Sequence, residues 1–207
     1  MLSITNVILI NGCFKLQGEV MPAKKVIFEK DVMAAALDLI REKGENSLNA
    51  RDLVKKINCS TQPIYSMYKN MQGVEEAVRQ AVARVLDEYM TNELKSGKYI
   101  GNQAIGMGYV RFAAEEKCLY RYLYMKTPQQ RSDINVELTK KSVGFIMEKY
   151  ALDEESASRY FTEIWIFSHG IASMVACDRL DYDEEKICVA FNDVATGLGL
   201  RFKNKGN

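Results

Sequence analysis

Residues 49–70 read NARDLVKKINCSTQPIYSMYKN, and this stretch predicts two short helices separated by a tight break. Asn49 is a good N-cap for the first helix, which covers residues 50–57 and carries apolar residues at helical spacing. Asn58 ends that helix, because asparagine is the residue that, after glycine, best adopts the left-handed conformation. The sequence therefore places the break immediately after residue 57.

The second helix begins after Ser60 or Thr61, either of which can act as its cap, and runs to about Tyr68. Pro63 falls in the first turn, where a missing backbone N–H leaves no hydrogen bond unmade. Two short helices joined by a turn of about three to four residues form a helix-turn-helix arrangement. We therefore predict this motif over residues 50–68.

A longer helix precedes the motif and another follows it. The first is closed by Gly44 as a C-terminal cap, and the second begins after Asn70 and ends at a break over residues 96–98. Each carries one apolar stripe at helical spacing. The stripe residues are Phe28, Val32, Ala35, Ala36, Leu39 and Ile40 before the motif, and Val74, Val78, Ala81, Val82, Val85 and Tyr89 after it.

The rest of the chain has helical patterns at roughly 102–116, 118–126, 130–150, 155–178 and 184–203, with no strand pattern and no internal repeat. Only three prolines interrupt a chain rich in good helix formers. We therefore predict an all-α protein. It consists of an N-terminal three-helix helix-turn-helix domain and a larger C-terminal helical domain.

We divide the chain into residues 1–21, 22–73 and 74–207. The first part lacks helical periodicity and ends in Gln17-Gly18-Glu19-Val20-Met21. Codons for Gly-Glu can resemble a ribosome-binding sequence, so we hypothesise that Met21 is the true start and that the extension is mis-assigned. Residues 22–73 carry nine Lys or Arg and six Asp or Glu, an excess compatible with phosphate binding.

Composition argues against membrane, metal and catalytic functions. The chain of 207 residues is 27% charged and has no apolar run near the length of a membrane span, so we expect a cytoplasmic protein. Its five cysteines are scattered without a C-x-x-C pair, which favours reduced thiols. The single histidine, His169, excludes multi-histidine metal sites and leaves only one base for a nucleophile. We therefore predict no metal, no cofactor and no catalytic residue.

Residues 32–82 resemble, without a gap, the DNA-binding domain of TetR-family transcriptional regulators. The matching residues are Ala35-Ala36-Leu37-Asp38-Leu39-Ile40, Lys43-Gly44, Leu48, Arg51-Asp52-Leu53, Ser60, Ile64-Tyr65, Tyr68-Lys69-Asn70 and Val74. The chain departs from the family at Asn58, where Gly is usual, and at Gln62-Pro63, where a small pair such as Gly-Thr is usual. It also has Met71 where a phosphate-contacting Lys is frequent.

The C-terminal half resembles the ligand-binding and dimerisation domain of a TetR subgroup named for a Trp/His-Gly signature. Trp165-Ile166-Phe167-Ser168-His169-Gly170 fits that signature, and residues 109–113 and 119–123 fit its upstream segment. The resemblance implies a homodimer formed through the helices at about 155–178 and 184–203. Small residues there permit close helix approach: Ser168, Gly170, Ala172, Ser173, Ala176, Ala190, Ala195, Gly197 and Gly199.

If the second short helix enters the major groove, Thr61, Gln62 and Ser66 can reach base edges. The Gln62 amide suits a bidentate contact with adenine, while Thr61 and Pro63 can touch a thymine methyl. The resemblance implies phosphate contacts by Tyr65 and Lys69 and a helix N-terminus presented at Asn49. The full predicted DNA-binding set is Asn49, Arg51, Ser60, Thr61, Gln62, Pro63, Tyr65, Ser66, Tyr68 and Lys69.

Some of these residues have a purely structural alternative. Arg51 can serve a local pair with a carboxylate, and Tyr65 can be a packing residue. Tyr68 is balanced between the core and a phosphate contact. Outside this set, His169 lies in an apolar stretch, where a histidine more often packs between helices than orients a ligand.

The middle of the chain is rich in aromatic residues and methionine, and such residues more often form the core. In this family, however, the same region encloses an effector pocket, and methionine suits an adaptable apolar cavity. We place an unknown small-molecule effector among five residues: Phe112, Tyr122, Met147, Trp165 and His169. The resemblance thus implies a sequence-specific, ligand-responsive repressor that binds double-stranded operator DNA in the nucleoid.

Two other functions remain open. The first is a helical ligand-binding or protein-interaction module that no longer binds DNA specifically. Only Met71 and the modest charge excess support this alternative. The second is a helical enzyme with His169 as base, which has no partner motif in the sequence. The salt dependence of binding to promoter DNA separates the first from a DNA-binding regulator.

Overall fold

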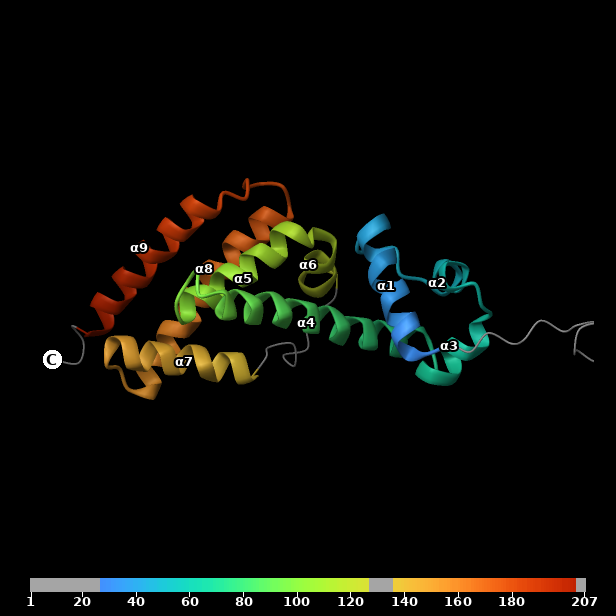
Figure 1. Ribbon diagram of the computed structural model, residues 1–207, viewed down its shortest axis with the longest axis horizontal. Helices are drawn as coiled ribbons and strands as arrows, with labels where there is room; N and C mark the ends of the chain where they lie inside the picture. Colours follow the sequence, from blue (N-terminus) through green and yellow to red (C-terminus); the bar gives the residue numbers. More distant parts are fainter. Residues whose placement is uncertain (1–26, 127–135, 204–207) are drawn as a thin grey trace, which may run out of the picture.

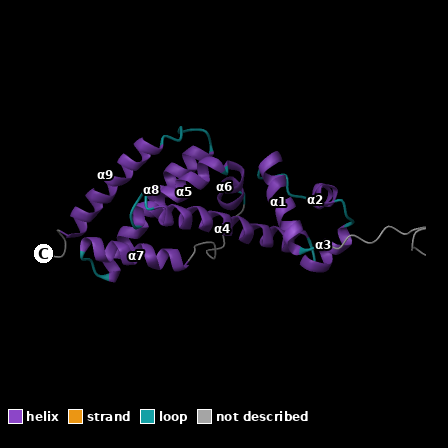
Figure 2. Cartoon of the chain, in the orientation of Figure 1, coloured by secondary structure: helices purple, strands orange, loops and turns teal. Residues whose placement is uncertain are grey.

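A computed structural model describes residues 27–126 and 136–203, and every regular element in these ranges is an α-helix (Figures 1 and 2). The predicted all-α class is therefore confirmed. The predicted extension over residues 1–21 and the start of the helix at 130–150 lie outside the described residues. The helices are α1 (Glu29–Lys43), α2 (Ala50–Ile57), α3 (Thr61–Tyr68), α4 (Met71–Ser96), α5 (Asn102–Glu115), α6 (Lys117–Tyr124), α7 (Val136–Tyr150), α8 (Glu154–Ala176) and α9 (Glu184–Lys203).

The long helix α4 connects the two ends of the molecule (Figure 1). Its first part packs against α1 and α3, and it continues into the larger part of the fold, where it packs against α5 and α6. The proposed domain division after Gly73 thus falls in the first turn of a continuous helix. One continuous helix therefore contacts α1 and α3 at one end and α5 and α6 at the other.

Two glycines allow helices to meet at the closest distances. A Cβ at Gly108 of α5 would lie 2.7 Å from the Met90 Cα and 2.8 Å from the Tyr89 carbonyl oxygen of α4. A Cβ at Gly73 would overlap the carbonyl oxygen of Tyr68, the last residue of α3. The absence of a side chain at these two positions therefore fixes how α5 and α3 sit against α4.

Helix α6 ties α1 to the larger part of the fold. The Arg41 guanidinium donates hydrogen bonds from Nε and NH2 to the Glu116 carboxylate at 2.9 and 2.7 Å. In the other direction, Arg121 donates from Nε to Glu45 at 3.1 Å and from NH1 to the Ala176 carbonyl oxygen at 2.7 Å. Two arginine–carboxylate pairs therefore hold the three-helix unit of α1, α2 and α3 against α6.

The apolar core continues from the three-helix unit into the larger part, with fully buried Leu39, Leu53 and Ile64 at one end and Phe112, Tyr120 and Tyr160 at the other. Within the described residues, no helix has both the length and the apolar character needed to cross a membrane. The cysteines at 59, 118, 177 and 188 are unpaired.

Candidate nucleic-acid interface and ligand cavity

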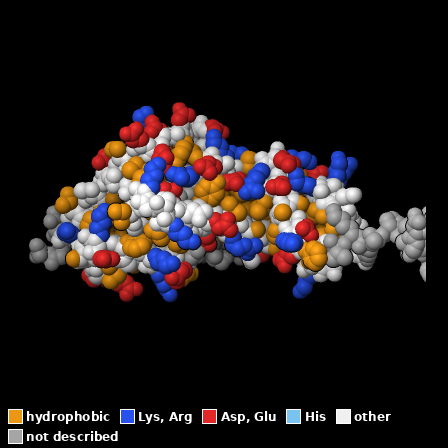
Figure 3. All heavy atoms as spheres, viewed as in Figure 1, with side chains coloured by type: hydrophobic (Ala, Val, Ile, Leu, Met, Phe, Trp, Pro, Cys, Tyr) orange, Lys and Arg blue, Asp and Glu red, His pale blue; other side chains and the backbone are white. Residues whose placement is uncertain are grey.

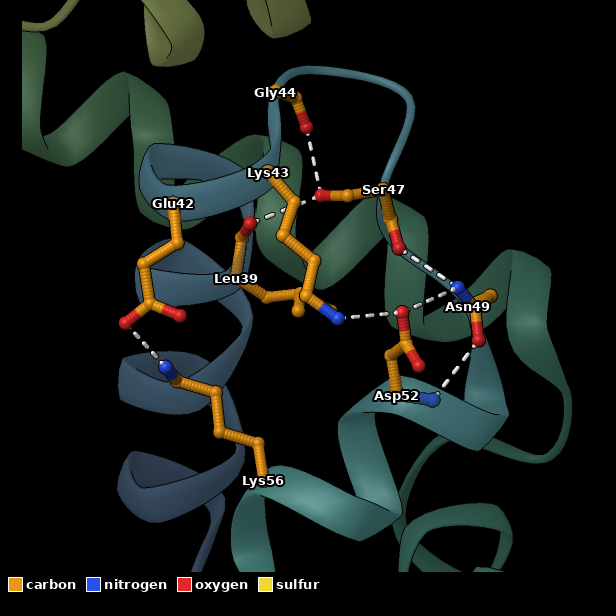
Figure 4. A network of polar contacts seen from close by, with 8 residues as sticks. All are labelled: Leu39, Glu42, Lys43, Gly44, Ser47, Asn49, Asp52 and Lys56. Atoms are coloured by element: carbon orange, nitrogen blue, oxygen red, sulfur yellow. Dashed lines mark hydrogen bonds and ion pairs between the residues drawn. The ribbon is translucent and has the colours of Figure 1, made fainter.

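The corner between α1 and α2 is held by a network of polar contacts (Figure 4). The Asn49 Oδ1 accepts a hydrogen bond from the backbone N–H of Asp52 at 2.9 Å, which confirms the predicted N-cap. The Asp52 carboxylate accepts from Lys43 at 3.0 Å, and this hydrogen bond is the main reason why the pKa of Asp52 is lowered. A second ion pair joins Lys56 of α2 to Glu42 of α1 at 2.7 Å. These contacts fix the angle between α1 and α2.

The loop between these helices follows the sequence prediction only in part. Gly44 has a positive φ of 92° as expected of a C-terminal cap, but its ψ of 170° lies outside the left-handed helical region. Ser47 stabilises the loop, because its hydroxyl donates to the carbonyl oxygens of Leu39 and Gly44 at 3.0 and 2.7 Å.

The break between α2 and α3 depends on Asn58, which has the predicted left-handed conformation with φ 56° and ψ 60°. The backbone N–H of Cys59 donates back to the Val54 carbonyl oxygen at 3.1 Å and closes the end of α2. Ser60 occupies the N-cap position of α3 as expected, but its side chain makes no capping hydrogen bond. The Ser60 side chain is exposed at the start of α3.

Helix α3 has one buried and one exposed face. Ile64 is 1% exposed and anchors α3 to the core, and Pro63 is half-buried beside it. The residues that point away from the core lie about one helical turn apart and share a face. Thr61, Gln62, Tyr65, Ser66 and Lys69 are all exposed. The structure thus exposes four of the ten predicted DNA-binding residues on the outer side of α3 and a fifth, Lys69, at the C-cap position that follows the helix.

The remaining predicted residues fall outside this face. Arg51 is exposed near the start of α2 and has no ion pair within the described residues, which disfavours the local-pair alternative. Tyr65, which lies on the exposed face of α3 itself, is 37% exposed, and this exposure disfavours a pure packing role. Tyr68 is half-buried with a shielded hydroxyl, and burial followed by the negative charge of Glu29 raises its pKa to about 12. This environment favours packing over a phosphate contact.

The turn between α3 and α4 holds two features that the sequence reasoning missed. Lys69 has a positive φ of 67°, which a lysine rarely adopts. Asn70 caps α4 at the predicted start of that helix, because its Oδ1 accepts from the backbone N–H of Gly73 at 2.9 Å. The second missed feature is the close approach of α3 and α4 at Gly73. A glycine one turn into an otherwise helical pattern was the available signal for the close approach of α3 and α4 at Gly73.

Charge on this part of the molecule is mixed. Figure 3 shows Lys and Arg side chains over the three-helix unit interspersed with Asp and Glu side chains. This distribution agrees with the small positive excess counted from the sequence. Affinity for a phosphate backbone would therefore depend on particular side chains rather than on a strong overall field.

His169 lies in an aromatic cluster between α5, α6 and α8. Its Nδ1 is 2.8 Å from the Tyr109 hydroxyl and 3.1 Å from the Tyr120 hydroxyl, and its ring stacks on Trp165 at a centroid distance of 5.3 Å. The edge of Tyr124 also faces the ring, at 5.1 Å. Burial lowers the pKa of His169, so the neutral imidazole is favoured at this position.

Three of the five predicted effector residues converge on this cluster. Phe112 is fully buried and contacts Tyr120 at a ring distance of 6.3 Å, which links it to His169 and Trp165. Tyr122 points instead towards α4, where its hydroxyl donates to the Glu75 carbonyl oxygen at 3.3 Å. Met147 is half-buried on α7.

A cavity of about 670 Å³ lies elsewhere, between the start of α5, the end of α7, and helices α8 and α9. None of the five predicted effector residues lines it. Its lining residues include Lys98, Tyr99, Gln103, Ile146, Lys149, Tyr150, Ile164, Phe191 and Asn192. Sequence reasoning missed this cavity because its lining comes from four separate segments that meet only in the folded chain. Within the described residues, no His, Cys, Asp and Glu side chains gather as a metal site.

No protein-family model and no curated protein matches this sequence. Three solved structures are similar in fold over most of their length. A TetR-like transcriptional regulator from Rhodococcus sp. RHA1 has a TM-score of 0.56 and 14% identity, covering 84% of this chain and 93% of its own. A TetR variant from Acinetobacter baumannii AYE in complex with minocycline has a TM-score of 0.56 and 19% identity, covering 88% and 99%. MexZ from Pseudomonas aeruginosa, described as a key repressor in antibiotic resistance, has a TM-score of 0.52 and 19% identity, covering 82% and 93%. The chain therefore has the fold of TetR-like regulators.

Proposed function

We propose that this protein is a sequence-specific DNA-binding transcriptional regulator that acts as a ligand-responsive repressor. The observation that carries the proposal is the outer face of α3, where Thr61, Gln62 and Ser66 are exposed on a helix that packs against α4. The fold that the chain shares with TetR-like regulators supports the same function.

The side chains on this face match the chemistry of DNA. The Gln62 amide can donate to adenine N7 and accept from adenine N6, a contact worth about 1–3 kcal/mol against the wrong base. Tyr65 on this face and Lys69 at the C-terminal end of α3 can contact phosphate oxygens and fix the register of the helix. Arg51 near the start of α2 offers a further charge that no carboxylate within the described residues neutralises.

A homodimer formed through α8 and α9 would present two copies of α3 to one DNA duplex. Large apolar side chains are exposed on both helices, among them Ile166 and Met174 on α8 and Val189 and Leu200 on α9. Gly170, on α8, is exposed and has open space where a side chain would be. A two-fold dimer matches a palindromic operator whose half-sites lie about 34 Å apart.

Ligand response follows from linkage between two sites. An effector that prefers the spacing of the α3 helices in which DNA does not bind lowers the affinity for DNA. DNA then lowers the affinity for the effector by the same factor. The continuous helix α4 provides the physical connection between the larger part of the fold and α3.

The test is fluorescence anisotropy with DNA taken from immediately upstream of the gene, measured over a series of salt concentrations. We expect Gln62→Ala to weaken specific binding by about 5- to 150-fold, which is the contribution of one bidentate base contact. Lys69→Gln should reduce the salt slope by about one unit, because the variant no longer neutralises one phosphate. Gln80→Ala, an exposed glutamine on α4 away from α3, is the matched control and should bind as the wild type does.

Wild-type binding that is indifferent to DNA sequence and equal to that of Gln62→Ala would contradict the proposal. The chain would then be better described as a ligand-binding or protein-interaction module.

A further inference from the structure

The cavity of about 670 Å³ has the size of a site for a small organic molecule, for which roughly 300–1,000 Å³ is usual. Its apolar walls come from Ile146 on α7, Ile164 on α8 and Phe191 on α9. Tyr150 and Tyr160 complete them, with ring centroids 5.1 Å apart. Figure 1 shows α7 and α9 converging at this end of the molecule, away from α1, α2 and α3.

Polar residues also line the same cavity. Lys98 and Lys149 line it together with the side-chain amides of Asn102, Gln103 and Asn192. Lys149 is exposed, its Nζ lies 5.3 Å from the Tyr150 ring centroid, and within the described residues it has no ion pair. Glu148 is the one carboxylate of the lining, so the two lysines leave an excess of one positive charge.

The Lys98 ammonium is paired with Glu184 at 3.0 Å, but it is not the only partner of that carboxylate. The Arg111 guanidinium also pairs with Glu184, and the Tyr99 hydroxyl donates to the same carboxylate at 3.1 Å. Lys98 can therefore turn to another anion without leaving the Glu184 carboxylate unpaired.

We propose that this cavity binds an organic acid with an apolar body, whose anionic group is held by Lys98 and Lys149 and whose body packs against Ile146, Ile164 and Phe191. Binding of such a molecule depends only on the cavity and does not require that the protein bind DNA. Its role as the effector of a DNA-binding regulator rests on the proposed function.

The same residues connect the cavity to α4. Arg111 lies between Glu184 and Glu93, with its NH1 3.0 Å from the Glu93 carboxylate. Glu93 is a buried residue near the end of α4, with 4% of its surface exposed. An acid that binds Lys98 removes it from Glu184 and leaves Arg111 as the main charge partner of the Glu184 carboxylate. Arg111 then interacts less strongly with Glu93. The other end of α4 packs against α1 and α3.

The experiment uses two fluorescent probes with the same ring framework. 1-Anilinonaphthalene-8-sulfonate carries an anionic group, and N-phenyl-1-naphthylamine lacks it. Both are titrated into the purified full chain without DNA, and into Lys98→Gln and Lys149→Gln. We expect each substitution to lower the affinity for the anionic probe by about fivefold, as for the loss of a partly exposed ion pair. The affinity for the neutral probe should stay within about twofold of the wild-type value. Lys141→Gln, on α7 but outside the lining, is the matched control.

Asn192→Phe tests the location, because this side chain lies on α9 at the lining and is otherwise exposed. It should weaken both probes at least fivefold, since an aromatic ring fills part of the cavity. If Lys98→Gln and Lys149→Gln bind the anionic probe as Lys141→Gln does, the lysines do not recognise an acid and the proposal is wrong. Full binding of both probes to Asn192→Phe would place them outside the cavity and also overturn it.

Anisotropy with upstream DNA, measured separately, distinguishes this proposal from the proposed function. If the wild type binds DNA specifically but the probes do not behave as expected, the cavity proposal is wrong and the proposed function is unaffected. If the probes behave as expected but specific DNA binding is absent, the acid site is supported and the proposed function is wrong.

Discussion

Replacing Gly73 by alanine should displace α3 from α4. The new Cβ would overlap the Tyr68 carbonyl oxygen and lie 3.1 Å from its carbonyl carbon, so backbone rather than a flexible side chain has to move. Inserting a methyl group into such a contact costs about 1–3 kcal/mol. The better helix propensity of alanine offsets about 1 kcal/mol of this, which leaves a net decrease of about 1 kcal/mol in the free energy of unfolding.

The larger effect should be on DNA binding, because the atoms that must move belong to the last turn of α3. A shifted α3 no longer aligns Gln62 with its base, which corresponds to about 5- to 150-fold in affinity. The net decrease in stability lowers the midpoint of thermal unfolding by only about 2–4 °C in a chain of this size. At 25 °C the variant is therefore almost fully folded, and anisotropy with upstream DNA reports the displacement itself.

Gly144→Ala is the matched control, because a Cβ at this position on α7 meets nothing within 4 Å. It should leave DNA binding unchanged and raise stability by up to about 1 kcal/mol through helix propensity alone. If Gly73→Ala behaved like Gly144→Ala in both assays, the close approach of α4 would not position α3.

Three further outcomes are expected. Asn49→Ala removes the N-cap of α2 and should lower the free energy of unfolding by about 1 kcal/mol in urea denaturation, and an unchanged midpoint would contradict this. Arg41→Gln and Glu116→Gln should show a coupling of up to about 1 kcal/mol in a double-mutant cycle, and additivity would mean that the pair does not tie α1 to α6. Burial lowers the pKa of His169, so the unfolded chain takes up the proton first and stability should fall as the pH drops through about 6.5. His169→Gln should remove that part of the pH dependence in denaturation curves, and an unaltered pH profile would exclude His169 as its source.

The helices and their ends were largely predictable because local chemistry determines them. Asn49 and Asn58 behave as their side chains dictate, and Gly97 ends α4 with a left-handed φ of 71°. The exposed face of α3 followed from helical spacing alone, since Ile64 had to face the core. Ser60 shows the limit, because its type fits a cap and its position is right, yet its side chain makes no capping hydrogen bond.

Long-range packing was the part that sequence could not provide. Phe112, Trp165 and His169 converge because Tyr120, on α6, bridges α5 and α8, and no local pattern indicates that bridge. The cavity near Lys98 and Lys149 was missed for the same reason, since residues some fifty positions apart meet there only through the crossing of α5, α7, α8 and α9. The type of residue suggested a ligand region, but only the packing of the helices defines where an empty volume is left.

Helix α6 joins one of the two candidate ligand regions to the three-helix unit of α1, α2 and α3. Its Arg121 and the preceding Glu116 hold Glu45 and Arg41 of the three-helix unit, while Tyr120 of the same helix lies against His169. Contacts thus connect the His169 cluster to α1 through α6, whereas they connect the Lys98 cavity to α4 through Glu93. The first route ends on α1 and the second on α4, which packs against both α1 and α3. Because they use different ion pairs, breaking the Arg41–Glu116 pair should weaken the first route and leave the second intact.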